Sequence, residues 1–235
     1  MRRQALYSAL GAMLLAGTVA QTAELKPFTA SYSVAWRGIT AGAATVSLTQ
    51  PTPDQWLYTS QVVARGVFRA VMPGQISQRS ELRLQHDGIQ PLHYTVSGPE
   101  RARPQELTFN WTTLRVAGTA GDKTVDAAIE PGTQDDLSVQ VALMHELNQG
   151  RTPSGFRIFN DRGLREYDYR REGTATLETA LGSIETVIYH SGRAGSDRVT
   201  RYWCAPSLGY LPLQVQQKRG ERVEVTMSIQ KLQRD

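Results

Sequence analysis

Apolar and polar residues alternate with a period of two along most of this 235-residue chain, and no other feature constrains its fold as strongly. In residues 28–36, aromatic and aliphatic side chains occupy the even positions, while threonine and serine occupy most of the odd ones. Because successive side chains of a β-strand point to opposite faces, this pattern predicts strands with one buried face. Similar segments recur as far as residue 229. The sequence therefore predicts a mainly β protein.

The strand-like segments number roughly 12, and their spacing of about 8–12 residues is typical of all-β sandwiches and barrels. No internal repeat or linker divides them. We therefore expect residues 24–235 to form a single β-rich domain, built as one antiparallel curved sheet that makes a half-barrel or a barrel-like structure. A change of parity between Trp111 and Leu114 predicts a bulge or a tight bend, and Gly173 predicts a turn between two strands.

Two segments depart from the alternation and predict helices. Residues 135–148 carry acidic side chains in their first turn, Asp135 and Asp136, and are followed by Gly150. Carboxylates stabilise a helix N-terminus and glycine commonly ends a helix, so this segment predicts an amphipathic helix. A shorter helical segment is expected near 67–72. The apolar residues that share one face in these two segments are Leu137, Val141, Met144 and Leu147, and Val67, Phe68, Val71 and Met72.

The N-terminal residues 1–20 have the features of a secretory signal peptide. Two arginines precede a short apolar run and then small residues, and this run is too short to span a bilayer comfortably. Cleavage is expected after Ala20, with an alternative after Ala23. Thr18 occupies the position where a bacterial lipobox has cysteine, so we predict a secreted periplasmic protein and not a lipoprotein. The alternative for this segment is an N-terminal membrane anchor.

The balance of charges argues against a nucleic-acid-binding protein. The chain has 26 basic and 22 acidic residues, and two of the arginines, Arg2 and Arg3, belong to the leader. The mature net charge is therefore only about +2, too small for a protein whose affinity depends on phosphates. The densest basic patch predicts either a solvated strand face or a surface for anionic lipid head groups or acidic glycans, and it comprises Arg162, Arg165, Arg170 and Arg171.

The sequence offers little chemistry for catalysis. It contains no motif for a serine nucleophile, a zinc protease, a dithiol or a phosphate-binding loop, and its four histidines have no metal-ligand spacing. The single cysteine, Cys204, cannot form an intrachain disulfide, and a lone thiol in an oxidising compartment is more often buried than reactive. We therefore predict a non-enzymatic protein with no catalytic residue, no metal and no cofactor.

Aromatic and long apolar side chains provide the candidate ligand-binding site. They either form an ordinary core or line an apolar cavity inside a curved sheet, closed by the segment 68–72 and the helix 135–148 as lids. The candidate ligand-binding residues are Trp36, Trp56, Phe68, Val71, Met72, Trp111 and Met144.

The segment Arg201–Leu213, with its Trp-Cys-Ala-Pro turn, resembles a strand–turn–strand signature of the bacterial envelope family known as domain of unknown function 3108. Similar stretches occur at 32–46, 131–138 and 182–189. The resemblance implies a secreted protein of Gram-negative bacteria and gives no catalytic residue. Cys204 stands at the variable position of the turn, which argues against a catalytic role.

Three functions remain open at this point. We expect a periplasmic protein that binds an apolar or lipid-like ligand, or another envelope component, in its curved sheet, by architectural analogy with half-barrel lipoprotein carriers. The first alternative is an envelope assembly or interaction protein that acts through a protein surface. The second is an envelope hydrolase. The sequence predicts no nucleic-acid or metal partner and leaves the oligomeric state open.

Overall fold

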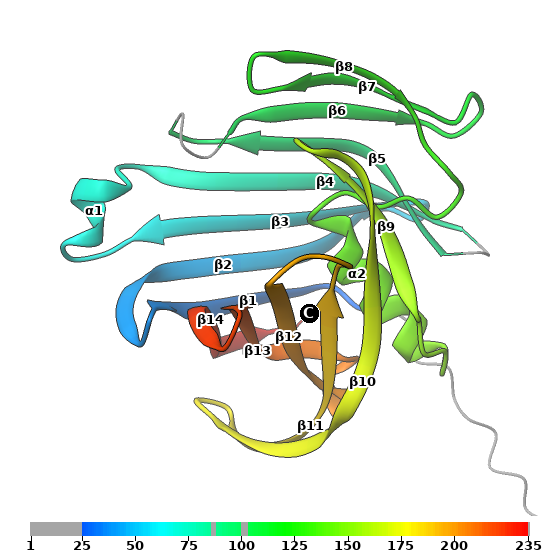
Figure 1. Ribbon diagram of the computed structural model, residues 1–235. Coiled ribbons are helices and arrows are strands. Elements are labelled where there is room, and N and C mark those ends of the chain that lie inside the picture. The colour runs from blue at the N-terminus through cyan, green and yellow to red at the C-terminus, as the bar shows by residue number, and fades with distance from the viewer. Residues whose placement is uncertain (1–24, 86–87, 100–102, 235) are drawn as a thin grey trace, which may run out of the picture.

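Fourteen strands form one continuous sheet in the computed structural model (Figure 1). The structure describes residues 25–85, 88–99 and 103–234, so the expected signal peptide of residues 1–20 lies outside it, as does the alternative end at 23. The strands are β1 (Phe28–Trp36), β2 (Ile39–Thr52), β3 (Gln55–Ala64), β4 (Gln75–Gln85), β5 (Gly88–Ser97), β6 (Gln105–Asn110), β7 (Arg115–Ala120), β8 (Lys123–Ala128), β9 (Gly155–Asn160), β10 (Gly163–Thr179), β11 (Gly182–Gly192), β12 (Arg198–Ala205), β13 (Leu211–Arg219) and β14 (Arg222–Gln233).

The sheet consists of two antiparallel meanders joined edge to edge. Strands β1 to β8 follow one another, strands β9 to β14 do the same, and β1 pairs with β14 between them. In Figure 1 the sheet curls around the helix that connects β8 to β9. The prediction of a mainly β protein with a single antiparallel, barrel-like sheet is confirmed.

Alternate turns of this meander gather at the same end of the sheet. Since each strand reverses the direction of the previous one, the connections that follow β1, β3, β9, β11 and β13 share one end. The short helix α1 (Phe68–Val71) lies in the β3–β4 connection and marks this end, which we call the α1 end. The expected helical segment near 67–72 is thereby confirmed.

The longer helix, α2 (Ser138–Asn148), lies on the concave side of the sheet. Nine of its eleven residues are buried, because both of its faces pack against apolar clusters. Val141 and Met144 belong to the main core with β1–β8, while Leu143 and Leu147 join a second cluster with β9–β12. The helix therefore fills the interior of the curved sheet. It is not an external lid that closes an empty cavity.

Asp135 precedes α2 and stabilises its first turn. Its Oδ1 accepts hydrogen bonds from the backbone N–H groups of Leu137 (2.8 Å) and Ser138 (2.6 Å), and its Oδ2 accepts one from the Ser80 hydroxyl at 2.6 Å. The helix begins at Ser138, three residues later than the expected range. The acidic residue satisfies N–H groups at the start of the helix, as predicted, but it does so while fully buried.

Two local predictions have different outcomes. The change of parity after Trp111 is a tight turn, in which Asn110 Oδ1 accepts hydrogen bonds from two backbone N–H groups and Leu114 has a φ of 51°. The prediction of a turn at Gly173 is wrong, because β10 continues through it to Thr179. Gly173, with φ of 154°, sits at a register shift against β11, so the glycine allows a bulge and not a chain reversal.

Candidate functional site

The candidate ligand-binding residues fall into three places and do not line one cavity. Trp56 and Met144 are buried in the main core. Trp111 packs against that core, and its indole N–H donates a hydrogen bond to the Pro91 carbonyl at 2.7 Å. The remaining four residues lie at the α1 end, and they are Trp36, Phe68, Val71 and Met72. Their binding of an apolar ligand stays a prediction.

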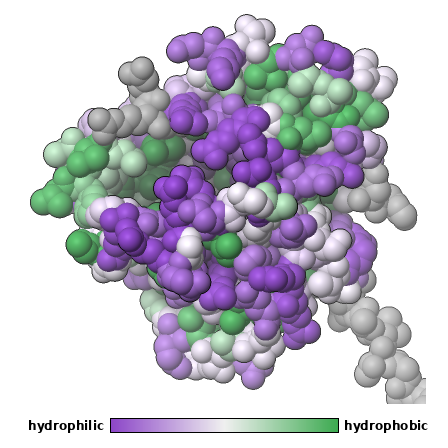
Figure 2. All heavy atoms as spheres, viewed as in Figure 1, coloured by the Kyte–Doolittle hydropathy of each residue, from purple (hydrophilic) through white to green (hydrophobic). Residues whose placement is uncertain are grey.

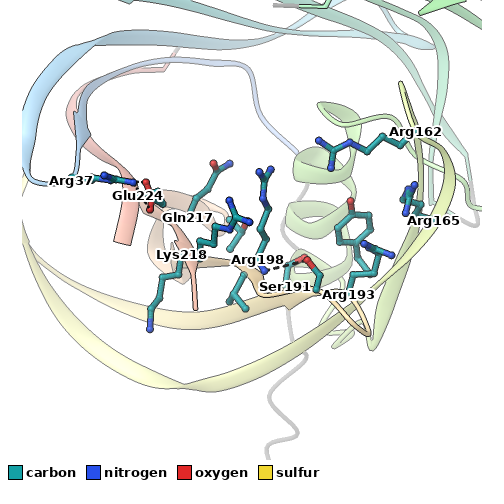
Figure 3. A pocket seen from close by; sticks show the side chains of 14 residues that line it. Arg37, Arg162, Arg165, Ser191, Arg193, Arg198, Gln217, Lys218 and Glu224 are labelled. Carbon is teal, nitrogen blue, oxygen red and sulfur yellow. Dashed lines mark hydrogen bonds and ion pairs between the residues drawn. The ribbon is translucent and has the colours of Figure 1, made fainter. Parts of the chain in front are cut away.

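A polar pocket of about 430 Å³ opens among the ends of the later strands (Figure 3). Its walls come from β10 to β14 and from turns at the α1 end. Its lining includes seven basic side chains and a single carboxylate among the described residues. The lining residues are Arg37, Arg162, Arg165, Tyr167, Ser191, Arg193, Ser196, Arg198, Val199, Thr200, Gln217, Lys218, Arg219 and Glu224. We call this site the arginine pocket.

Some of these basic groups are neutralised by neighbouring carboxylates. Arg37 and Glu224 form a two-pronged pair, with Nε···Oε2 at 2.8 Å and Nη2···Oε1 at 3.0 Å. This hydrogen bond from Arg37 lowers the pKa of Glu224, which therefore remains a carboxylate at neutral pH. Arg219 Nε lies 2.9 Å from Asp197 Oδ2. The pair formed by Arg37 and Glu224 contributes little net charge to the arginine pocket.

Three other guanidinium groups lack such partners. Arg165, Arg193 and Arg198 form no ion pair with any carboxylate that the structure describes. The Nε of Arg165 is buried and has no hydrogen-bond acceptor. Arginines that share a pocket without counter-charges repel one another, and a buried donor without an acceptor costs free energy. An anion in the arginine pocket would relieve the repulsion among these charges.

The alternation of β10 explains how Arg165 reaches the pocket. Arg165 and Tyr167 occupy odd positions and line it, whereas the residues at the even positions 166, 168 and 170 are exposed. Of the basic patch expected from the sequence, Arg162 and Arg165 therefore contribute to the pocket. Arg170 and Arg171 do not line it, because they lie farther along the strand and are exposed.

Sequence reasoning missed most of the arginine pocket. Figure 3 shows Arg37 on one side and Arg162 and Arg165 on the other, with Arg198 between them. These residues are far apart in the chain, and only the meander brings their turns to the same end. The available signal was the density of arginine around 193–198 and 218–222. An analysis of alternation alone treats these arginines as ordinary turn residues.

The signature segment of the predicted family contributes to structure. Gly209 and Tyr210 adopt positive φ values of 61° and 57° after the short 3₁₀ helix Pro206–Leu208. The Asn148 amide at the end of α2 donates a hydrogen bond to the Gly209 carbonyl at 3.1 Å. The Tyr32 hydroxyl donates one to the Pro212 carbonyl at 2.9 Å. The turn thus ties α2 and β1 to β13.

Groups with nucleophilic or metal-binding potential are dispersed. Cys204 is fully buried, and this burial raises the pKa of its thiol. His93 and His190 each lie beside a glutamate, and no histidine in the described part of the chain hydrogen-bonds a serine, threonine or cysteine. The same residues contain no cluster of three histidine, cysteine, aspartate or glutamate side chains placed to hold a metal.

The comparison with protein families decides the membership of this chain. Residues 31–223 match the model of a family described as "Protein of unknown function (DUF3108)". The chain belongs to the DUF3108 family. The resemblance expected from the Trp-Cys-Ala-Pro turn is confirmed, and the match covers strands β10 to β13 in full and the first two residues of β14. No curated protein matches the sequence significantly.

Several solved structures are similar to this chain at low sequence identity. A beta-barrel-like DUF1849 protein from Brucella abortus is 9% identical, with a TM-score of 0.60, over 91% of this chain and 99% of that one. An exported protein from Bacteroides fragilis with a YmcC-like fold is 9% identical, with a TM-score of 0.41, over 89% and 97%. MucB, in a Pseudomonas aeruginosa complex with MucA, is 13% identical, with a TM-score of 0.37, over 92% and 54%. The first match shows that this chain shares its fold with that DUF1849 protein.

Proposed function

We propose that this DUF3108 protein is a non-enzymatic periplasmic protein that binds an anionic envelope component in the arginine pocket. The observation that carries the proposal is the excess of basic side chains in the pocket lining, three of which form no ion pair with a described carboxylate. Arginine is well suited to phosphate and carboxylate groups because its planar donors form paired hydrogen bonds with their oxygens. The signal-peptide features of residues 1–20 support the periplasmic location.

The dimensions and lining of the pocket favour a small anionic group over a bare acyl chain. A volume of about 430 Å³ falls within the usual range for small-molecule sites, roughly 300–1,000 Å³. Its neutral lining includes Tyr167, Ser191 and Thr200, whose hydroxyls can hydrogen-bond the oxygens or sugar hydroxyls of a ligand. Apolar binding inside the sheet is less favoured because α2 fills the interior.

The ligand chemistry, a phosphate or carboxylate, could belong to a lipid head group or to an acidic sugar. Isothermal titration calorimetry with short-chain phosphatidylglycerol below its micelle-forming concentration, with glucuronate and with uncharged glycerol separates these sources. We expect binding of at least one anion, none of glycerol, and an affinity that falls as salt increases. Equal affinity for glycerol and the anions would contradict the proposal.

Substitutions test whether this binding occurs in the arginine pocket. Arg165→Gln and Arg198→Gln each remove a charged donor and should lower the affinity for the anion about tenfold or more. Arg170→Gln is the matched control, since Arg170 lies on the same strand as Arg165 but outside the pocket. If the control weakens binding as much as Arg165→Gln, general surface charge and not the pocket is responsible.

The interaction alternative is supported by one feature of the sheet. Strands β8 and β9 are its two edges, so the backbone groups of β8 face no partner strand on one side. An open edge is a template for pairing with an extended segment of another protein. Co-purification of an envelope protein with the unaltered chain would favour this function if Val125→Pro in β8 abolished that co-purification. The same variant should retain anion binding.

A further inference from the structure

A cluster of exposed apolar side chains protrudes at the α1 end, outside the arginine pocket. Seven large apolar residues are exposed in the described chain, and five of them lie in or directly beside two neighbouring connections at this end. Figure 2 shows hydrophobic residues gathered at the left edge of the molecule, over α1. This apolar tip comprises Trp36 (40% exposed), Ile39 (60%), Val67 (80%), Val71 (60%) and Met72 (39%).

The two connections form one surface. The rings of Trp36 and Phe68 meet edge to face with their centroids 6.0 Å apart. The backbone N–H of Arg65 donates a hydrogen bond to the Ala41 carbonyl at 2.8 Å, which holds the start of the β3–β4 connection beside β2. Contiguous exposed apolar surface on a soluble protein marks an interaction site. The apolar tip is therefore a built feature and not a scatter of single side chains.

The charge around the apolar tip is positive. Arg65 and Arg69 are exposed there and form no ion pair with the carboxylates that the structure describes. The sequence from residue 25 to residue 80 contains a single acidic residue, Asp54, and it lies in the β2–β3 turn at the opposite end of the sheet. Glu224 lies on β14, which pairs with β1, and it is already paired with Arg37. The tip thus complements an apolar surface with negative charges at its border.

We propose that the apolar tip docks the protein onto an anionic lipid surface. Short protruding segments that expose tryptophan and aliphatic side chains, with arginines at their border, suit insertion at the boundary between head groups and acyl chains. The arginines gain attraction from anionic head groups. A binding partner that is a folded protein would usually meet a broader and flatter surface than one helical turn and one hairpin offer.

The proposal is independent of anion binding in the arginine pocket, although the two sites share the α1 end. The Arg37 guanidinium lies 4.5 Å from the centre of the Trp36 ring and also lines the arginine pocket. Docking through the apolar tip would consequently bring the arginine pocket close to the lipid head groups.

Sedimentation with vesicles tests the proposal on the mature secreted protein. Vesicles of phosphatidylcholine alone are compared with vesicles that contain about one-third phosphatidylglycerol. We expect stronger binding to the anionic vesicles, and a loss of about tenfold or more in the double variant Ile39→Ser/Val67→Ser. Arg65→Gln/Arg69→Gln should reduce the preference for anionic vesicles. Leu84→Ser is the matched control, because Leu84 is an exposed apolar residue far from the apolar tip.

Three outcomes would overturn the proposal. One is vesicle binding by Ile39→Ser/Val67→Ser that equals that of the unaltered protein. Another is a loss of self-association, and not of vesicle binding, in that variant, which would assign the tip to a second copy of the chain. The third is a loss of vesicle binding in Arg165→Gln/Arg198→Gln alone, which would support the arginine pocket and refute the tip. All variants share the same N-terminus, so differences among them report the altered sites.

Discussion

Asp135 places a buried carboxylate beneath the first turn of α2, and its replacement by asparagine gives a sharp test of the electrostatics. Asparagine keeps an oxygen that can accept from the N–H groups of Leu137 and Ser138, and its amide can donate to the Ser80 hydroxyl. The substitution therefore removes the charge while retaining the hydrogen bonds. Any change in how stability depends on pH then reports the cost of burying that charge.

The magnitude follows from the pKa. Burial raises the pKa of Asp135 from 3.8 to about 6, against the opposing effect of its hydrogen bonds. Below pH 3.8 the carboxyl is protonated in both the folded and the unfolded chain. As the pH rises toward 6, the unfolded chain ionises first, so the free energy of unfolding of the unaltered protein falls. At 1.36 kcal/mol per pKa unit, the total loss is about 3 kcal/mol.

Urea unfolding at several values of pH measures this effect. The free energy of unfolding of Asp135→Asn, minus that of the unaltered protein, should increase by about 2–3 kcal/mol from about pH 4 to about pH 7. Asp54→Asn is the control for removing a carboxylate from an exposed position, since Asp54 lies in a turn. A difference for Asp135→Asn that is independent of pH, or that decreases as the pH rises, would refute the reasoning.

Two further predictions concern the core and the thiol. Met144→Asp places a charge in the main core and should prevent folding. Phe68→Asp, at the partly exposed α1 end, should leave the far-ultraviolet circular dichroism and the cooperative unfolding transition intact. A folded Met144→Asp protein would contradict the placement of α2. Cys204 should not react with a thiol reagent such as Ellman's reagent until the protein unfolds, because it is buried and its thiol pKa is raised. Rapid labelling of the native protein would show that β12 opens readily.

Local sequence patterns predict the strands and both helices because these depend on side-chain periodicity. The turn after Trp111 was predictable in the same way, from a change of parity. The position of α2 was not, since its polar residues, including Ser138, His145 and Asn148, indicate an exposed face, yet all three are buried between two parts of the sheet. Period two also cannot distinguish a bulge from a turn at a glycine, as Gly173 shows.

The candidate site was less predictable than the fold for a related reason. A core residue can be predicted from the apolar and polar pattern of its neighbours in the sequence. The arginine pocket depends instead on which turns the sheet topology brings together. Arg165 was recognised as part of a basic patch, whereas Arg193 and Arg198 belong to a connection that looked unremarkable in the sequence. The dispersal of Trp56 and Trp111 from Trp36 likewise follows from positions along the strands, which hydrophobicity alone does not encode.

The pairing of β1 with β14 has a consequence for how the chain folds. Every other ladder in the sheet joins strands that are consecutive in the sequence, whereas Thr29 faces Gln233 across nearly the whole chain. Each meander can form through local hairpins, but the two meanders merge only when this one distant contact closes, and closing so long a loop carries an entropic cost. We therefore expect folding in two kinetic phases, with strand edges exposed at β1 and β14 until the second phase. During that interval the unpaired edges are open to other chains, so the slowest step of folding is also the one that most needs protection from aggregation.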